Sequence, residues 1–121
     1  MPWSGQEPPY GFTTGPGTWL PMPSGWGALT AHAQRDDDAS MLSLYRTALS
    51  LRGSSEAFTG EDVQWLQAPD RCVAFRRSGG LVCFLNLSGA TVPLPEGRVL
   101  LSSVPVDDGT VPDDAAVWLQ A

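Results

Sequence analysis

Lysine is absent from the sequence, and histidine and cysteine are scarce. All seven basic residues are arginine and thirteen residues are acidic, so the formal net charge at pH 7 is −6. Nucleic-acid binding depends on basic side chains that neutralise phosphates, so the composition argues against a nucleic-acid partner. One histidine and two cysteines also argue against a structural zinc site. We expect no bound metal and no cofactor.

Long apolar runs are missing as well. No segment approaches the ~18–20 consecutive apolar residues that a membrane helix needs, so no membrane span is expected. The chain does not open with a basic segment followed by an apolar run, which predicts no signal peptide. Together with free cysteines, these features predict a cytoplasmic location.

The two cysteines flank a predicted hairpin. If Gly79-Gly80 forms the turn, Arg76 faces Cys83. Cys72 then faces Leu87, and the two sulfurs lie roughly 13 Å apart at a strand rise of about 3.3 Å. That separation is too long for a disulfide, so we expect two free, buried thiols.

Proline and glycine crowd the first 27 positions, so residues 1–35 are predicted to form an irregular arm. The arm carries many large apolar side chains: Trp3, Tyr10, Phe12, Trp19, Leu20 and Trp26. So much aromatic surface should be covered. Burial against this domain or a missing one is one interpretation, and stacking on sugar rings is the other.

Residues 36–53 are predicted to form a helix. Asp36-Asp37-Asp38 supply negative charge at its N-terminus, with Asp37 as the expected cap, and Gly53 is the expected stop. One buried side is predicted from apolar residues at helical spacing: Met41, Leu44, Tyr45, Ala48, Leu49 and Leu51. The aspartate run lacks the alternate ligands and glycine turn of a calcium loop, which favours a solvated cap.

Residues 58–121 are predicted to form an antiparallel β-sandwich-type domain of about six strands. The candidate strands are Val63–Leu66, Cys72–Arg77, Leu81–Leu87, Thr91–Leu94, Arg98–Ser102 and Ala116–Gln120. Turn residues separate them, among them Ser78-Gly79-Gly80, Ser88-Gly89 and Asp107-Asp108-Gly109. Pro93 and Pro95 indicate an edge strand. The fold class is therefore mainly β, preceded by the arm and one helix.

No catalytic residue can be assigned from the sequence. His32 stands alone, without the nucleophile and orienting group of a Ser-His-Asp site, and is more typical of a surface histidine. The cysteines suit small apolar roles in strands. Asn86-Leu87-Ser88 matches a glycosylation acceptor by accident if the chain is not secreted. Glycoside hydrolysis needs two carboxyl groups that flank the scissile bond, and no such pair can be chosen here.

Several strings, in order, resemble the C-terminal part of glycoside hydrolase family 13 α-glucosidases of the oligo-1,6-glucosidase and maltase group, especially actinobacterial ones. The strings are Met1-Pro2-Trp3, Gly11-Phe12, Trp19-Leu20-Pro21, Tyr45-Arg46, Leu51-Arg52, Val73–Arg77, Asn86–Ser88, Leu100–Ser103 and Ala116–Leu119. The resemblance covers essentially the whole chain. It implies the last loop (1–35) and last helix (36–53) of a (β/α)₈ barrel, then a C-terminal β domain (58–121).

The family uses an Asp nucleophile, a Glu acid/base and a second Asp, all N-terminal to the Met1-Pro2-Trp3 motif. The resemblance therefore implies a non-catalytic, structural fragment whose partner is the missing barrel and whose parent enzyme hydrolyses terminal α-glucosidic bonds with retention. It places Trp3 and Phe12 near the substrate entrance. The alternative is a small carbohydrate-binding module that binds α-glucosides through the arm. Without the barrel, the apolar helix side is expected to drive self-association.

Overall fold

The computed structural model describes residues 2–15, 17–106 and 108–121. Met1 of the Met1-Pro2-Trp3 string and Asp107 of the predicted Asp107-Asp108-Gly109 turn lie outside the described residues. The chain divides into one unit that ends at Thr47 and a second unit, Ala48–Ala121. Within the described residues, no helix has the length and apolarity needed to cross a bilayer.

The first unit is mostly irregular, as predicted for residues 1–35, but it contains two short helices. The 3₁₀ helix η1 spans Trp26–Leu29 and the α-helix α1 spans Ala31–Gln34. Thr30 joins them: its hydroxyl accepts a hydrogen bond from the amide of Ala33 at 3.2 Å and so caps α1. These helices begin where the proline-rich stretch ends.

The long helix α2 spans Met41–Ser54, so it begins later than predicted. Its cap is Ser40, whose hydroxyl oxygen accepts from the amide of Ser43 at 3.2 Å. The prediction that Asp37 caps the helix was wrong, because its carboxylate accepts from the amide of Ala39 in a turn before the helix. None of the fourteen residues of α2 is buried, so the predicted buried side is also wrong for this chain.

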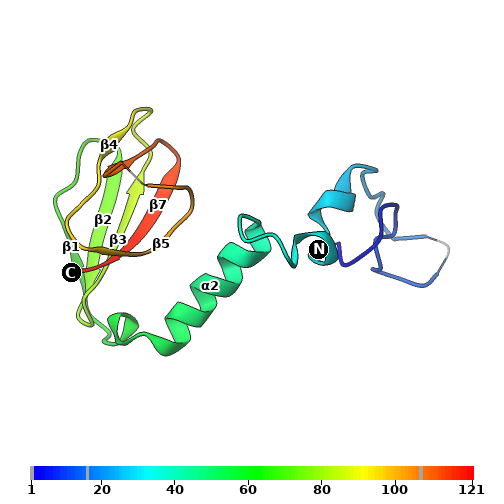
Figure 1. Ribbon diagram of the computed structural model, residues 1–121, viewed down its shortest axis with the longest axis horizontal. Coiled ribbons are helices and arrows are strands. Elements are labelled where there is room, and N and C mark those ends of the chain that lie inside the picture. The colour runs from blue at the N-terminus through cyan, green and yellow to red at the C-terminus, as the bar shows by residue number, and fades with distance from the viewer. Residues whose placement is uncertain (1, 16, 107) are drawn as a thin grey trace. The chain divides into compact units, whose positions relative to one another are not determined.

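The second unit contains an antiparallel sheet of five strands in the order β1-β2-β3-β7-β5 (Figure 1). These strands are β1 (Val63–Trp65), β2 (Cys72–Arg77), β3 (Leu81–Asn86), β7 (Ala115–Gln120) and β5 (Arg98–Ser102). A separate two-stranded sheet pairs β4 (Val92–Pro93) with β6 (Thr110–Val111). The mainly β, antiparallel prediction is therefore confirmed. Strand β6 was missed because two residues are too few to show a period.

The hairpin register differs from the prediction by one residue. Phe75 pairs with Cys83, and Cys72 pairs with Asn86. A slip of one residue exchanges the faces of a strand, so the two cysteines point to opposite faces of the sheet. Both are free, as expected, but each is half-buried and not fully buried.

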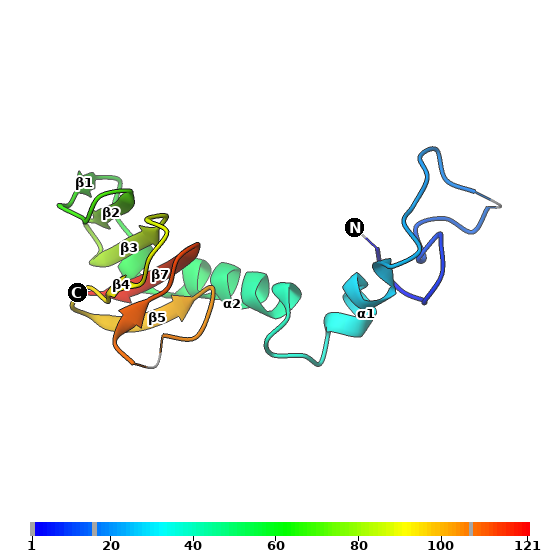
Figure 2. The ribbon, with the colours of Figure 1, turned by 90° about the horizontal axis from the view of Figure 1, so that it is seen from above.

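The core lies on one face of the five-stranded sheet, where the strands at its centre contribute alternate residues. The buried cluster consists of Ala74, Val82, Phe84, Val111, Ala115, Val117 and Leu119. Val92 of β4 and Val106 pack against it from the connecting segments. Figure 2 shows β4 on the same side of the unit as β7 and β5. The small sheet therefore helps to cover this face.

Candidate functional site

Tyr10 holds the arm together. Its side chain is 1% exposed, and its hydroxyl donates to the carbonyl oxygen of Pro23 at 2.8 Å. The same hydroxyl accepts from the amide of Trp26 at 3.3 Å. Its backbone carbonyl accepts from the amide of Trp3 at 2.8 Å and from that of Ser4 at 3.0 Å. One buried residue thus ties three segments of the arm to each other.

The start of α1 is hydrogen-bonded to the N-terminal residues of the same unit. The amide of Ala31 donates to the carbonyl of Pro2 at 3.1 Å, and that of His32 donates to the carbonyl of Trp3 at 3.0 Å. Gly27 is buried against Gln6, and a Cβ at position 27 would approach the Gln6 side-chain oxygen to 2.6 Å. The backbone around Trp3 is therefore held by hydrogen bonds rather than by an apolar core.

The scaffold buries Tyr10 but leaves several other large side chains exposed. Trp3 is 51% exposed and Phe12 is 57% exposed, and Trp19 is almost fully exposed. The structure thus places the two predicted substrate-proximal residues, Trp3 and Phe12, on one hydrogen-bonded loop unit. Exposed aromatic faces on a fixed backbone can stack on sugar rings or pack against another protein surface.

Acidic and histidine side chains of the described residues form no cluster of metal-binding type. His32 is exposed on α1, as expected of a surface histidine. The carboxylate of Asp113 accepts from the amide of Gly89 at 2.8 Å, and that of Asp108 accepts from the hydroxyl of Thr110 at 2.6 Å. The Thr110 bond lowers the pKa of Asp108, whereas a glycosidase acid needs a raised pKa. These carboxylates stabilise turns.

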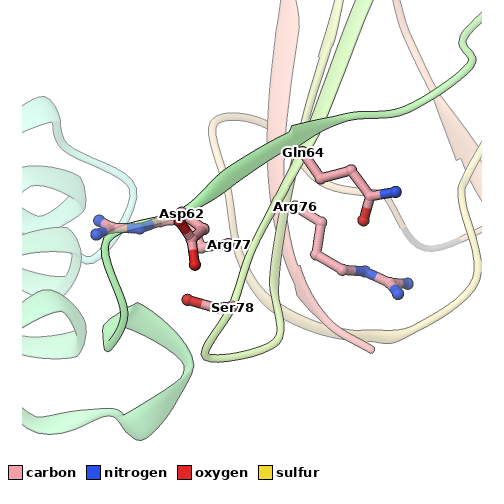
Figure 3. A pocket seen from close by; sticks show the side chains of 5 residues that line it. All are labelled: Asp62, Gln64, Arg76, Arg77 and Ser78. Carbon is pink, nitrogen blue, oxygen red and sulfur yellow. The ribbon is translucent and has the colours of Figure 1, made fainter.

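A small surface pocket lies at the open end of β1 and β2. It is lined by Asp62, Gln64, Arg76, Arg77 and Ser78. Figure 3 shows Gln64 and Arg76 extending to one side, while the guanidinium of Arg77 extends away from them. The guanidinium of Arg77 donates instead to the carbonyl oxygen of Gly60. The charged groups do not converge, so the pocket lacks the arrangement of a ligand site.

The face of the five-stranded sheet opposite the core carries an apolar row that crosses every strand. In order of pairing, its members are Trp65, Phe75, Cys83, Trp118 and Leu101. Trp65 packs edge-to-face on Phe75 with ring centroids 5.8 Å apart, yet it remains 71% exposed. We refer to these five residues as the outer row.

One short element lies over part of the outer row. The 3₁₀ helix η2 (Glu56–Phe58) places Phe58 edge-to-face on Trp118 at 5.0 Å between ring centroids. Burial raises the pKa of the neighbouring Cys83 thiol, against the opposing effect of its hydrogen bond with Trp118. Sequence reasoning missed this face. The signal was the unbroken apolar run Leu81–Leu85, because a strand with one solvated face would alternate.

No family model matches the chain, and no curated protein matches it by sequence. Solved structures do resemble it. One is an alpha-glucosyl transfer enzyme, XgtA, at 26% identity and a TM-score of 0.67, with 98% of this chain and 24% of that chain covered. Another is an alpha-amylase from H.orenii, at 20% identity and a TM-score of 0.59, with 86% of this chain and 25% of that chain covered.

The chain spans about a quarter of the length of these solved structures. It is structurally similar to the C-terminal portion of glycoside hydrolase family 13 α-glucosyl transfer enzymes and amylases. The similarity to XgtA covers both the aromatic arm and the β domain, since it extends over nearly the whole chain. The predicted resemblance is thus supported at the level of fold, as a likeness to the C-terminal portion of such enzymes.

Proposed function

We propose that this chain is the C-terminal fragment of a family 13 α-glucosidase, itself non-catalytic, which completes and stabilises a (β/α)₈ barrel. The observation that supports this proposal is the structural match to an α-glucosyl transfer enzyme, which covers 98% of this chain but only 24% of the enzyme's chain. In the parent enzyme, retaining hydrolysis of terminal α-glucosidic bonds takes place on carboxylates of the barrel. This chain supplies a loop, a helix and a sheet around that barrel.

The exposure of large apolar side chains supports a structural role for this chain. The side chains that a barrel would cover are exposed, namely Leu49 on α2 and Trp65 on the sheet, at 64% and 71%. Isolated proteins rarely expose apolar surface over so many elements unless a partner covers it. Linkage preference and the balance of hydrolysis and transglucosylation then belong to residues of the barrel.

Two measurements test the proposal. The purified chain should release no p-nitrophenol from p-nitrophenyl α-glucoside above a boiled control. The DNA immediately upstream of codon 1 should encode a (β/α)₈ barrel with an Asp nucleophile and a Glu acid/base. Steady turnover by the chain alone, or upstream DNA without such a barrel, contradicts the proposal.

A second candidate function is sugar binding by the arm. The favouring observation is that Trp3 and Phe12 are exposed on a hydrogen-bonded scaffold. Aromatic rings held in this way stack on the apolar faces of glucose units. Titration with maltose or isomaltose should then change the tryptophan fluorescence, and the change should be lost in Trp3→Ala. An unchanged spectrum at millimolar sugar rejects this function.

The two candidates make different demands on Trp3 and Phe12. As part of a barrel loop, they need only lie near the substrate entrance of the assembled enzyme. As a binding module, they must bind sugar in the isolated chain. A chain that binds no sugar alone but lowers the KM of an assembled enzyme favours the fragment over the module.

A further inference from the structure

We propose that Asp108-Gly109 is a modification site, at which the aspartate converts spontaneously into isoaspartate, and that the side chain of Thr110 sets the rate. This pair is the single Asp-Gly step in the sequence. Both of its residues are exposed in the turn that leads into β6, which begins at Thr110. The inference depends only on residues of the β domain, so it stands apart from the proposed function.

The reaction needs the two residues and water. In the neutral acid form of Asp108, the side-chain carbon Cγ is attacked by the amide nitrogen of Gly109. A C–N bond forms, and the carboxyl hydroxyl leaves with the amide proton as water. The resulting succinimide then takes up one water: opening at Cγ restores aspartate, and opening at the main-chain carbonyl carbon gives isoaspartate. The product has the mass and charge of the original chain, and nothing is oxidised or reduced.

Gly109 leaves the space that ring closure needs. Its φ is +72°, which glycine adopts readily. Its chain neighbours aside, a Cβ at this position would meet no atom of the described residues within 4 Å. Every other aspartate in the sequence precedes a residue with a Cβ, as Asp62 precedes the β-branched Val63. That carbon hinders the approach of the nitrogen, so Asp108 should react before the other aspartates.

Thr110 holds the aspartate in its unreactive form. Its hydroxyl donates to Oδ1 of Asp108 over 2.6 Å, and its amide donates to the same oxygen over 3.2 Å. Both donors stabilise the carboxylate anion, whereas ring closure requires the neutral acid. The hydroxyl bond is the largest cause of the lowered pKa of Asp108. Less of the reactive acid is therefore present near neutral pH than at an ordinary aspartate.

Isomerisation would reach the core through β6. Isoaspartate adds one atom to the main chain directly before Gly109, whose carbonyl oxygen accepts from the amide of Leu94 at 2.9 Å. Val111 follows two residues later, is fully buried and accepts from the side chain of Asn86. A longer main chain in this turn disturbs both hydrogen bonds. The modified chain should therefore unfold at a lower temperature than the unmodified chain.

The test is ageing of the full chain in neutral buffer, with three versions side by side. Isoaspartate is quantified by methylation with an isoaspartyl methyltransferase and located by electron-transfer fragmentation of the peptides. In the wild type it should appear at position 108 before any other aspartate. Thr110→Val should accelerate its formation roughly threefold or more, because the hydroxyl donor is lost. Thr110→Ser keeps a hydroxyl and should remain within about twofold of the wild type.

The pH profile separates the assigned role of Thr110 from a general loosening of the turn. The rate falls as Asp108 ionises, and the midpoint of that fall should lie at higher pH in Thr110→Val than in the wild type. Faster formation with an unmoved midpoint, or equal rates in the two versions, overturns the role of Thr110. Absence of isoaspartate at position 108 from all three aged versions overturns the modification site itself.

Discussion

The side-chain amide of Asn86 donates to the backbone carbonyl of Val111 over 3.0 Å, and this hydrogen bond joins the large sheet to the small one. The same nitrogen also donates to the carbonyls of Ala90 at 2.7 Å and Pro112 at 2.9 Å. The Asn86 oxygen accepts from the amide of Ser88 at 3.0 Å. Asn86 is fully buried, so it is a structural residue and its side chain is inaccessible to modification in the folded domain.

Replacing Asn86 should therefore destabilise the β domain strongly. In Asn86→Asp, a carboxylate would face three carbonyl oxygens, and we expect a loss of about 3 kcal/mol or more at pH 7. The measurement is urea unfolding followed by circular dichroism. Ser88→Ala is the control, because its hydroxyl bonds are exposed, and it should cost less than about 1 kcal/mol. Equal effects of the two variants would show that Asn86 does not join the sheets.

Alanine substitutions at Gly79 and Gly53 should change the stability of the protein in opposite directions. A Cβ at Gly79 would lie 2.5–2.7 Å from the carbonyl oxygens of Glu56, Thr59 and Ala57, whereas a Cβ at Gly53 has open space. Gly79→Ala should displace η2 and cost more than about 2 kcal/mol. Gly53→Ala should stabilise by about 0.5–1 kcal/mol, since alanine favours a helix interior. Thermal unfolding of both variants checks the pair, and a stable Gly79→Ala contradicts the close packing of η2.

Tyr10→Phe should loosen the arm without affecting the β domain. The change removes the donor to Pro23 and the acceptor for the amide of Trp26, which together contribute about 1–2 kcal/mol. Hydrogen exchange at the Trp26 amide should accelerate roughly tenfold, while the amides of β3 keep their protection. Tyr45→Phe is the matched control, because the Tyr45 side chain is 63% exposed. Unchanged exchange at Trp26 would indicate that other contacts hold the arm.

The pKa of Asp108 should depend on Thr110. The hydroxyl of Thr110 is the main cause of the lowered pKa, so Thr110→Val should raise the pKa of Asp108 back toward the ordinary value of an aspartate. A lowered native pKa means that this carboxylate adds stability above its unfolded pKa. The contribution is lost as the pH falls through the native pKa. Carboxyl titration by NMR checks the shift, and an unmoved pKa in the variant contradicts the assignment.

The isolated chain should self-associate through α2. Met41, Tyr45 and Leu49 recur every four residues on the helix and are each at least 60% exposed, which leaves one apolar stripe. Sedimentation should show dimers or larger species that dissociate on dilution, and Leu49→Lys should reduce them. Thr47→Lys is the control, because Thr47 lies off the stripe and the added charge is the same. A monodisperse monomer at every concentration contradicts this prediction.

Local patterns were sufficient to predict most of the fold. The alternation and turn residues around Gly79-Gly80 identified the β2–β3 hairpin, and β2 and β5 have the predicted bounds. These features depend on steric preferences of neighbouring residues, which the sequence states directly. The arm was likewise evident, because prolines exclude long regular elements wherever they occur.

The tertiary structure alone decided which residues meet. The side-chain role of Asn86, the strand β6 and the hairpin register rest on contacts between residues far apart in the chain, and a register error of one residue exchanged the faces of the cysteines. The outer row is visible only once five strands are paired, because its members come from separate segments. Periodicity shows that apolar residues recur at the spacing of a strand or a helix. Which residues they contact in the fold depends on how the strands pair.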